Sequence, residues 1–514
     1  MNRQASHCVG LWGPAACVFL FTVLCGGDRY IAVSATDAMG SPAESRPEAA
    51  RGPLTVHPNN PRYFTDGTGR AIYLAGSHHW NNFLDSGEAH QPIKTFDFDR
   101  YLSLLSSFGH NFIRLWAWEG GVNKNYVDLF PYARTGPGVA LDGKLRFDLD
   151  RFDRAYFDRL RSRVVAAEAR GIYVSVMLFN GWSLYDHGFG NSWSRHPFNA
   201  ANNVNGVNGD PDGDGEGKDL QSRPTPAVLA RQEAYIRQVV DAVNDLDNVL
   251  YEISNESDLL SKDWQYRMIR FVHDYERTKP KQHPVGMTAF DTNPEEADRS
   301  RAMEVLLASP AEWISPCNDR TANYATAPPA TTGRKVVLAD TDHFFPVGGD
   351  HSWVWKTFLR GLNPVYMDPL DQITGLSQDP VGAETARKAM GHTRSYARKM
   401  NLAAMKPDSA VCSTGYCLAG HGSEYVVYLP FGAHWFEPWV AQFPLRVQRW
   451  IKSLNLFHRT VTVDLSAVSR PVAVEWFDPV KGITLPGGTS EGGKPQHFTA
   501  PFRGDAVLYL RASS

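Results

Sequence analysis

Short apolar runs alternate with amphipathic helical patterns through most of the chain. The runs expected to be strands lie at 71–75, 111–119, 173–179, 249–256, 283–290, 312–316, 335–343 and 364–369. Helical patterns lie between several of them, at 97–108, 150–170, 227–246 and 263–277. Because consecutive parallel strands need a crossover helix, the alternation predicts an α/β fold, a (β/α)8 TIM barrel over residues 54–402. The sixth helix is the weakest expectation, since 318–333 is rich in Ala, Thr and Pro.

The pattern changes after Met400. Short strands separated by Gly and Pro turns are expected at 425–429, 460–465, 472–476 and 506–510. They predict a small antiparallel β-sandwich as an accessory domain over residues 403–514. Between its strands, the segment 432–459 contains three tryptophans and either faces a carbohydrate or partner or packs on the barrel as a helix, which is the favoured interpretation.

The amino terminus has the pattern of an export signal. Arg3 precedes an apolar run at 9–25, and Val33-Ser34-Ala35 offers small residues for cleavage. We therefore expect a signal peptide at 1–35 and a linker at 36–53, with no transmembrane segment in the mature chain. The protein is predicted to be secreted, periplasmic or on the cell surface. A lipid anchor at Cys25 stays open as an alternative.

Composition narrows the function classes. The net charge of -3 does not indicate a protein that binds nucleic acid. The 14 tryptophans exceed what a core usually needs, and a sugar-binding cleft uses tryptophan rings for stacking. Three of the six cysteines lie in the leader, which leaves Cys317, Cys412 and Cys417. Cys412 and Cys417 flank a turn-like spacer and can pair in an oxidising compartment. No Cys/His metal motif is present in the sequence.

Polar and aromatic side chains gather where the expected barrel strands end. They are His78, His79, Trp80, Arg114, Trp118, Glu119, Asn180, Trp182, Asn255, Glu256, Asp340, Asp342, His343 and Asp368. The carboxyl ends of barrel strands share one rim, where such folds keep their chemistry. The sequence therefore predicts a polar and aromatic pocket that binds a substrate.

Two carboxylates on opposite strands are what glycoside hydrolysis requires. Glu256 is expected to be the general acid/base; its alternatives are a helix cap or a solvated loop residue. The nucleophile is Asp340 or Asp342, which strand alternation places on the same face. Asp340 is narrowly favoured because it directly follows the apolar run. Arg114 is expected to orient this carboxylate and keep it ionised, or to form a structural ion pair, and both roles are compatible.

The chain here resembles the clan-A (β/α)8 glycoside hydrolases, with Asn255-Glu256 on strand four, Arg114 on strand two and an acid on strand seven. It is most similar to an apiosidase-like, cellulase-related bacterial family whose barrel is followed by a β-domain labelled collagen-binding. The segments that carry this resemblance, from about residue 60 to 510, are 63–80, 112–116, 251–256, 340–343 and 476–482. The resemblance implies a retaining glycosidase of a plant or microbial polysaccharide with no required cofactor. Such enzymes place a Glu on strand seven, whereas this chain has only aspartates there.

An acidic loop between the third and fourth strands has the spacing of an EF-hand loop. Asn208, Asp210, Asp212 and Asp219 stand at positions 1, 3, 5 and 12, with Gly213 at position 6. No helical pattern precedes the loop, so a true EF-hand is not expected. Two interpretations stay open, a structural calcium site and a solvated acidic loop on the rim.

Two other function classes fit the same sequence. One is a non-catalytic carbohydrate-binding protein that keeps the barrel without a competent nucleophile. The other is an adhesin in which the tail domain carries the function and the barrel is a scaffold.

Overall fold

The computed structural model describes residues 49–88, 91–121, 125–186, 192–290, 296–318, 323–344, 349–370, 383–431 and 460–513. The predicted signal peptide at 1–35, most of the predicted linker and the Trp-rich segment 432–459 lie outside these residues. Within the described part of the chain, no helix is long and apolar enough to cross a membrane.

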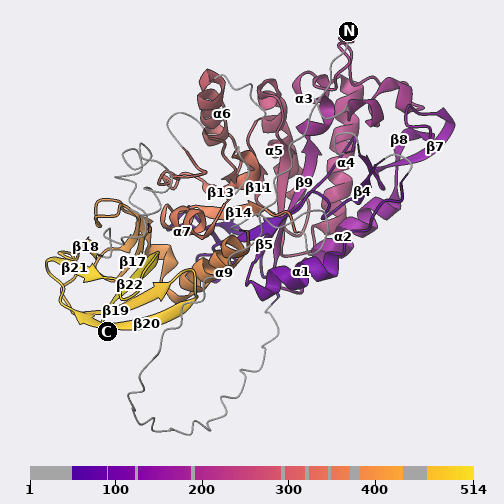
Figure 1. Cartoon of the computed structure of the whole chain (residues 1–514). Helices are drawn as coiled ribbons and strands as arrows, with labels where there is room; N and C mark the ends of the chain where they lie inside the picture. The colour runs from indigo at the N-terminus through magenta and orange to yellow at the C-terminus, as the bar shows by residue number, and fades with distance from the viewer. Residues whose placement is uncertain are drawn as a thin grey trace, which may run out of the picture. The chain divides into compact units, whose positions relative to one another are not determined.

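Eight parallel strands form the barrel (Figure 1). Seven of them overlap the runs expected from the sequence, and the first begins directly after its expected run, 71–75. They are β3 (Gly76–His78), β5 (Phe112–Leu115), β9 (Tyr173–Asn180), β10 (Val249–Asn255), β11 (Val285–Met287), β12 (Trp313–Ile314), β13 (Val336–Asp340) and β14 (Asn363–Met367). The sheet order is β3-β14-β13-β12-β11-β10-β9-β5. Its two ends meet, because the Asn111 N–H donates to the Ala75 carbonyl at 3.0 Å. A Cβ at Gly76 would lie 1.9 Å from the Phe112 carbonyl oxygen, so only glycine permits this approach.

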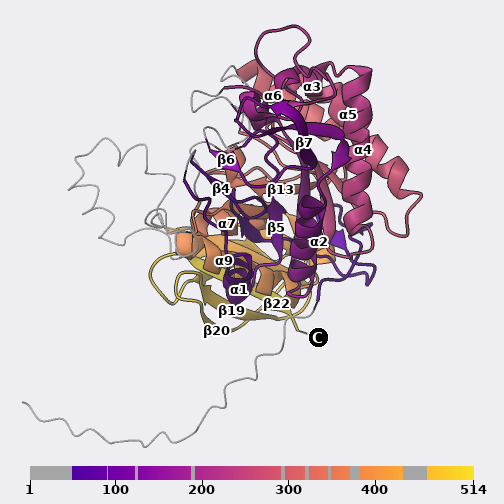
Figure 2. The same ribbon diagram turned by 90° about the vertical axis from the view of Figure 1, so that its right-hand side faces the viewer.

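Helices cover the outside of the strands. They are α1 (Phe98–Ser107), α2 (Arg154–Glu168), α4 (Pro226–Val243), α5 (Lys262–Glu276), α6 (Glu296–Ala308), α7 (His351–Leu359) and α9 (Ala383–Lys399), with the single turn α3 (Asp219–Ser222) before α4. Side chains of Asp97, Asp153 and Thr225 cap the first turns of α1, α2 and α4. Figure 2 shows α2 and α4 side by side. Between β12 and β13 the described residues contain no helix, as the Ala, Thr and Pro composition indicated.

A hairpin that the sequence analysis did not predict lies between β5 and α2. Its strands are β7 (Tyr132–Val139) and β8 (Leu145–Phe152), which pair antiparallel with register shifts. Gly136, Gly138 and Gly143 have positive φ in this segment and are the turn signals that could have indicated it. Two shorter pairs join β1 (Thr55–Val56) to β2 (Phe64–Thr65) and β4 (Ser86–Gly87) to β6 (Tyr126–Val127).

The carboxyl-terminal part forms antiparallel sheets, as expected. The larger sheet has the order β15 (Lys406–Pro407), β16 (Cys417–Gly420), β17 (Glu424–Leu429), β22 (Ala506–Ala512), β19 (Val472–Asp478), β20 (Ile483–Ser490). A two-stranded sheet contains β18 (Thr460–Asp464) and β21 (Pro495–Thr499). The boundary expected at 402/403 stays a prediction; it falls between the end of α9 and the start of β15.

The central strand β17 of the six-stranded sheet is buried on both faces, whereas the edge strand β20 is exposed. Alternate residues of β17 point in opposite directions, and Tyr425 and Val427 pack with Val461 of β18 in one core. Their neighbours on the strand, including Tyr428, belong to the core of the barrel, where the Tyr428 ring stacks on Trp355 of α7 with centroids 6.4 Å apart. The barrel and the β-domain therefore share a hydrophobic core.

Candidate active site

Arg114 on β5 lies at the centre of the polar network inside the barrel. Its Nε and Nη2 donate to both carboxylate oxygens of Glu252 on β10, at 2.9 and 2.5 Å, and Nη1 donates to Asp340 Oδ2 at 2.8 Å. Nη2 also donates to Asn255 Oδ1 at 2.7 Å. All four side chains are buried. The ion pair expected for Arg114 is present, and it joins strands two, four and seven.

Glu252 is a member of this network that the sequence analysis missed. It sits in the middle of a strand in which every residue is buried, Val249–Asn255. A lone carboxylate inside such a run cannot be buried without a cation partner, and that requirement was the available signal.

Asp340 is fully engaged by protein donors. Its Oδ1 accepts from His78 Nε2 at 2.9 Å and from the Asp342 backbone N–H at 3.0 Å, while Oδ2 accepts from Arg114. The indole N–H of Trp116 donates to His78 Nδ1 at 2.6 Å, which leaves Nε2 to carry the proton that reaches Asp340. Burial alone would raise the pKa of Asp340, but His78 and Arg114 outweigh it and hold the pKa well below its usual range.

Asp342 differs from Asp340 although alternation assigned them the same face. The strand ends at Asp340, and a 3-10 turn, Thr341–His343, carries Asp342. Its buried Oδ2 makes no hydrogen bond within the described part of the chain and lies 3.6 Å from Arg114 Nη1. Burial and the negative charge of Asp340 raise the pKa of Asp342 to about 6. The Asp342 side chain is 9% exposed, whereas the Asp340 side chain is fully buried, so Asp342 is the more accessible of the two carboxylates.

Glu256 follows β10 in a strained backbone conformation. Its φ is 45°, one of two positive values among the described non-glycine residues, and such strain gathers at functional sites. The side chain is half-buried and accepts from Asn255 Nδ2 at 3.1 Å. A Cβ at Gly181 would lie 2.6 Å from the Glu256 carbonyl oxygen, so the loop after β9 packs directly on this turn.

Strand alternation would place Asn255 and Glu252 on opposite faces of β10, yet Arg114 Nη2 donates to both side chains. Regular alternation ends at the last residue of β10, where the chain turns through the left-handed conformation of Glu256. Alternation along the sequence therefore cannot assign faces at the rim.

Three predicted aromatic and imidazole residues gather at the ends of β3 and β5. The Trp118 indole N–H donates to the Trp80 carbonyl at 2.9 Å and its ring stacks on Trp116. Trp80 is 45% exposed, whereas His79 is buried and stacks on Phe96. Burial lowers the pKa of His79 to about 4, so the ring is neutral.

Glu119, Asn180 and Trp182 are also brought together, at the ends of β5 and β9. Glu119 Oε2 accepts from the Asn180 backbone N–H at 2.8 Å, and its Oε1 lies 3.6 Å from His196 Nε2. The Asn180 side chain accepts from the Trp182 backbone N–H at 3.1 Å. His196 was not expected from the sequence, because it lies in the long segment between β9 and β10.

Asp368 and His343 are bonded to other protein groups. Asp368 forms a bidentate ion pair with Arg387 of α9, and both side chains are buried. His343 is buried between Ser315 Oγ at 2.8 Å and Asn255 Oδ1 at 3.1 Å. Contact of either residue with a substrate stays a prediction.

Comparison with known proteins agrees with the fold. Residues 110–297 match the profile of a domain of unknown function, DUF6298. The search among curated proteins found no match. A solved glycoside hydrolase is similar with a TM-score of 0.50 and 12% identity, over 90% of this chain and 97% of the other.

Two solved structures from Bacteroides vulgatus ATCC 8482 are also similar. One is a family 5 glycoside hydrolase, with a TM-score of 0.50 and 13% identity over 90% of this chain and 94% of the other. The second is a proposed glycoside hydrolase, with a TM-score of 0.53 and 14% identity over 90% of this chain and 83% of the other. At such identities the likeness shows the fold. The apiosidase-like resemblance and the collagen-binding label of the tail stay predictions.

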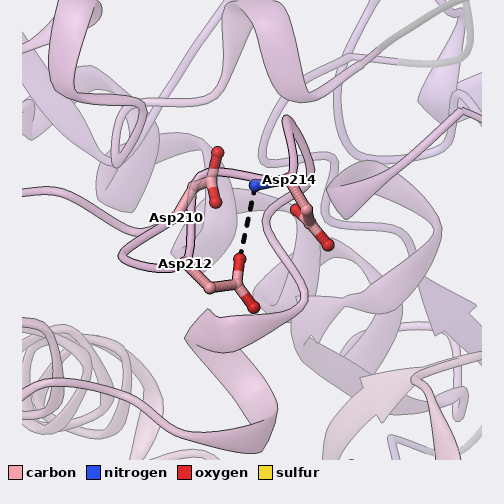
Figure 3. Close-up of side chains that lie close together, drawn as sticks. All are labelled: Asp210, Asp212 and Asp214. Carbon is pink, nitrogen blue, oxygen red and sulfur yellow. Dashed lines mark hydrogen bonds between the residues drawn. The ribbon is translucent and has the colours of Figure 1, made fainter.

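The acidic loop gathers carboxylates, but its membership differs from the expected set. Asp210, Asp212 and Asp214 each place a carboxylate oxygen within 4.8 Å of the others (Figure 3). Asp219 does not join them, because it begins α3 and pairs with Arg223 at 3.0 Å. The Asn208 side chain accepts from the Asp210 backbone N–H. Asp214 therefore replaces Asp219 in the candidate ligand set, and calcium binding stays a prediction.

The two cysteines expected to pair are adjacent. Cys412 and Cys417 are free, buried thiols in hydrogen-bonding contact. The bond from Cys417 is the main cause that lowers the pKa of Cys412 to about 7. A disulfide between them stays a prediction.

Proposed function

We propose that the protein is an exported glycoside hydrolase that cleaves an oligo- or polysaccharide by a retaining mechanism. The observation that carries the proposal is the constellation around Arg114. It connects Glu256, through Asn255, with Asp342, which follows strand seven and is partly exposed. The barrel places both at strand ends, where its chemistry is found.

Asp342 suits the nucleophile better than Asp340, which the sequence narrowly favoured. Both oxygens of Asp340 accept protein hydrogen bonds and its side chain is fully buried. The Asp342 side chain is 9% exposed, and Arg114 at 3.6 Å favours its ionised form. Asp340 then acts as a fixed anion that holds Arg114 and the turn carrying Asp342.

The chemistry follows from these roles. Glu256 donates its proton to the leaving glycosidic oxygen while Asp342 attacks the anomeric carbon and forms a glycosyl ester. Water, deprotonated by Glu256, then displaces Asp342 and restores both carboxyl groups. Retention requires the Glu256 and Asp342 carboxyl groups to lie about 5–5.5 Å apart with substrate bound.

Rim aromatics would bind the sugar. The exposed Trp80 ring, supported by Trp118, presents an apolar face of the kind on which pyranose rings stack. Trp182 and Glu119 lie at the neighbouring strand ends and are proposed to contact the same glycan.

The test begins with aryl glycosides and with plant and microbial polysaccharides. Glu256→Gln should nearly abolish cleavage of natural glycosides, by about 10²–10⁴-fold, and spare bond cleavage in aryl glycosides with activated leaving groups. Asp342→Gly should be inactive until azide is added, and azide occupying the place of the lost carboxylate should give a glycosyl azide of inverted configuration.

Asp340→Gly is the matched variant, with the same change two residues away. Azide rescue of Asp340→Gly and not of Asp342→Gly would reverse the two assignments. Sugar binding by the wild type without cleavage of any glycoside would replace the hydrolase with a carbohydrate-binding protein.

A further inference from the structure

The orientation of the Asn255 side-chain amide is fixed by its neighbours. Its Oδ1 accepts from Arg114 Nη2 at 2.7 Å, and its Nδ2 donates to Glu256 Oε2 at 3.1 Å. A flipped amide would place N–H groups against the guanidinium, which only donates, and oxygen against a carboxylate. His343 Nε2, at 3.1 Å from Oδ1, completes this arrangement.

The same logic fixes the tautomer of His343. Because Asn255 Oδ1 only accepts, His343 Nε2 must carry a hydrogen. In the neutral ring Nδ1 is then an acceptor, and the Ser315 hydroxyl donates to it at 2.8 Å.

The surroundings of His343 keep it neutral. Burial, followed by the positive charge of Arg114, lowers the pKa of His343 to about 3. The other charged and titratable groups that face the ring are Asp340, His78 and Asp342, whose Oδ2 lies 3.8 Å from Nε2. Both ring nitrogens of His343 are thus committed to protein partners, and the side chain is fully buried.

We propose that Ser315 and His343 form a positioning relay that holds the Asn255 amide so that its N–H donates to Glu256. The relay ties together the ends of β10, β12 and β13, because Ser315 follows β12 and His343 ends the turn after β13. A hydrogen bond donated to a carboxylate favours its charged form. The relay therefore favours the charged form of Glu256 through this bond and contributes to the pH dependence of proton donation to the leaving group. This role rests on the proposed hydrolase function.

The experiment compares pH–rate profiles of full-length variants on an aryl glycoside. His343→Leu removes the donor to Asn255, so kcat should fall about tenfold with little change in KM, and the basic limb should move up by about one pH unit. His343→Gln keeps an N–H donor and should restore part of both quantities. Ser315→Ala, which leaves His343 in place, should shift the limb in the same direction by less.

Ser309→Ala is the matched control. The Ser309 hydroxyl is also buried, but it donates to the Leu306 carbonyl at 2.7 Å before β12, at the opposite end of the strand from Ser315. Its pH–rate profile should match the wild type. A basic limb of His343→Leu that superimposes on the wild-type limb would overturn the relay, as would an equal shift in Ser309→Ala.

A nuclear magnetic resonance measurement separates the relay from the proposed function. In protein labelled with ¹⁵N-histidine, the His343 signals are those lost in His343→Gln, and they should show a protonated Nε2 and a bare Nδ1. A protonated Nδ1 at neutral pH would overturn the relay even in an active hydrolase. The expected tautomer in a protein that cleaves no glycoside would overturn both the hydrolase function and the role of the relay in proton transfer.

Discussion

Replacing Arg114 by methionine tests how much the guanidinium stabilises the centre of the barrel. Methionine keeps much of the length of the side chain and removes every donor. Among the described residues, Glu252 would then retain only Ser175 Oγ, at 3.4 Å, whereas Asp340 would keep His78 and the Asp342 N–H. Breaking a buried pair by removing one partner costs about 3–5 kcal/mol. We expect the free energy of unfolding to fall by that amount, mainly through the stranded Glu252.

The loss should depend on pH with a definite sign. In the wild type, the depressed pKa of Asp340 contributes stability that is present above the unfolded value of about 3.9 and is lost as the pH falls towards the folded value. In Arg114→Met, the unpaired carboxylate of Glu252 is relieved by taking up a proton. The difference in unfolding free energy between the variant and the wild type should therefore become smaller as the pH falls from about 8 to about 5. Urea unfolding followed by tryptophan fluorescence measures this difference.

Two further variants make the result decisive. Arg114→Met with Glu252→Gln replaces the stranded charge by a neutral amide and should recover part of the loss. Arg154→Met removes an exposed guanidinium that pairs with Asp158 at 3.2 Å and should change the unfolding free energy by less than about 0.5 kcal/mol. A double variant less stable than Arg114→Met alone, or a single loss below about 1 kcal/mol, would refute the reasoning.

Three other predictions concern regions away from the barrel centre. Burial would lower the pKa of His351, but the bond to Asp505 at 2.5 Å outweighs it and raises the pKa. The pair therefore stabilises the folded protein fully below about pH 6.5, and this contribution is lost as the pH rises through the folded pKa. In urea unfolding, a His351→Gln variant should lack this pH dependence. Oxidised glutathione should convert Cys412 and Cys417 to an intramolecular disulfide, with the loss of two hydrogens by mass spectrometry; two unreacted thiols would contradict it. If the loop 208–219 binds calcium, the ion should raise the midpoint of thermal unfolding and a chelator should reverse the gain, whereas no response would leave a solvated loop.

The barrel could be predicted because its strands are buried on both faces. Runs such as Tyr173–Asn180 and Val249–Asn255 are buried at every position, and buried parallel strands read as continuous apolar segments. The β7–β8 hairpin was missed because most residues of its strands are exposed or half-buried, and because glycines interrupt β7. The hydrophobic pattern identifies strands that form the core and does not identify strands that lie on the surface of the barrel.

The sequence predicted which strand ends carry the site residues, but it did not predict which of these residues bond to one another. Arg114, Asn255 and Glu256 were each expected at strand ends, and the structure joins them by hydrogen bonds. The partners Glu252, inside a strand, and Ser315, in a weak strand pattern, were missed. These contacts join residues on different strands of the barrel, and the sequence around each residue does not predict them. Asp340 and Asp342 could be told apart only once the 3-10 turn between strand and loop was known.

The shared core decides how the tail must be tested. Cut at residue 403, the β-domain would expose the face of its central sheet that carries Tyr428, Phe477 and Tyr509, which now pack on the barrel helices through Trp355 and Tyr396. An apolar face of that kind favours aggregation over a stable monomer. We therefore expect the isolated tail to be insoluble or unfolded, and a failure of that fragment to bind would say nothing about adhesion. Binding by the full chain that survives loss of the rim tryptophan Trp80 would be the informative result, because it would place the contact away from the barrel mouth. A soluble, cooperatively folding fragment would show instead that the interface contributes little to the stability of the tail.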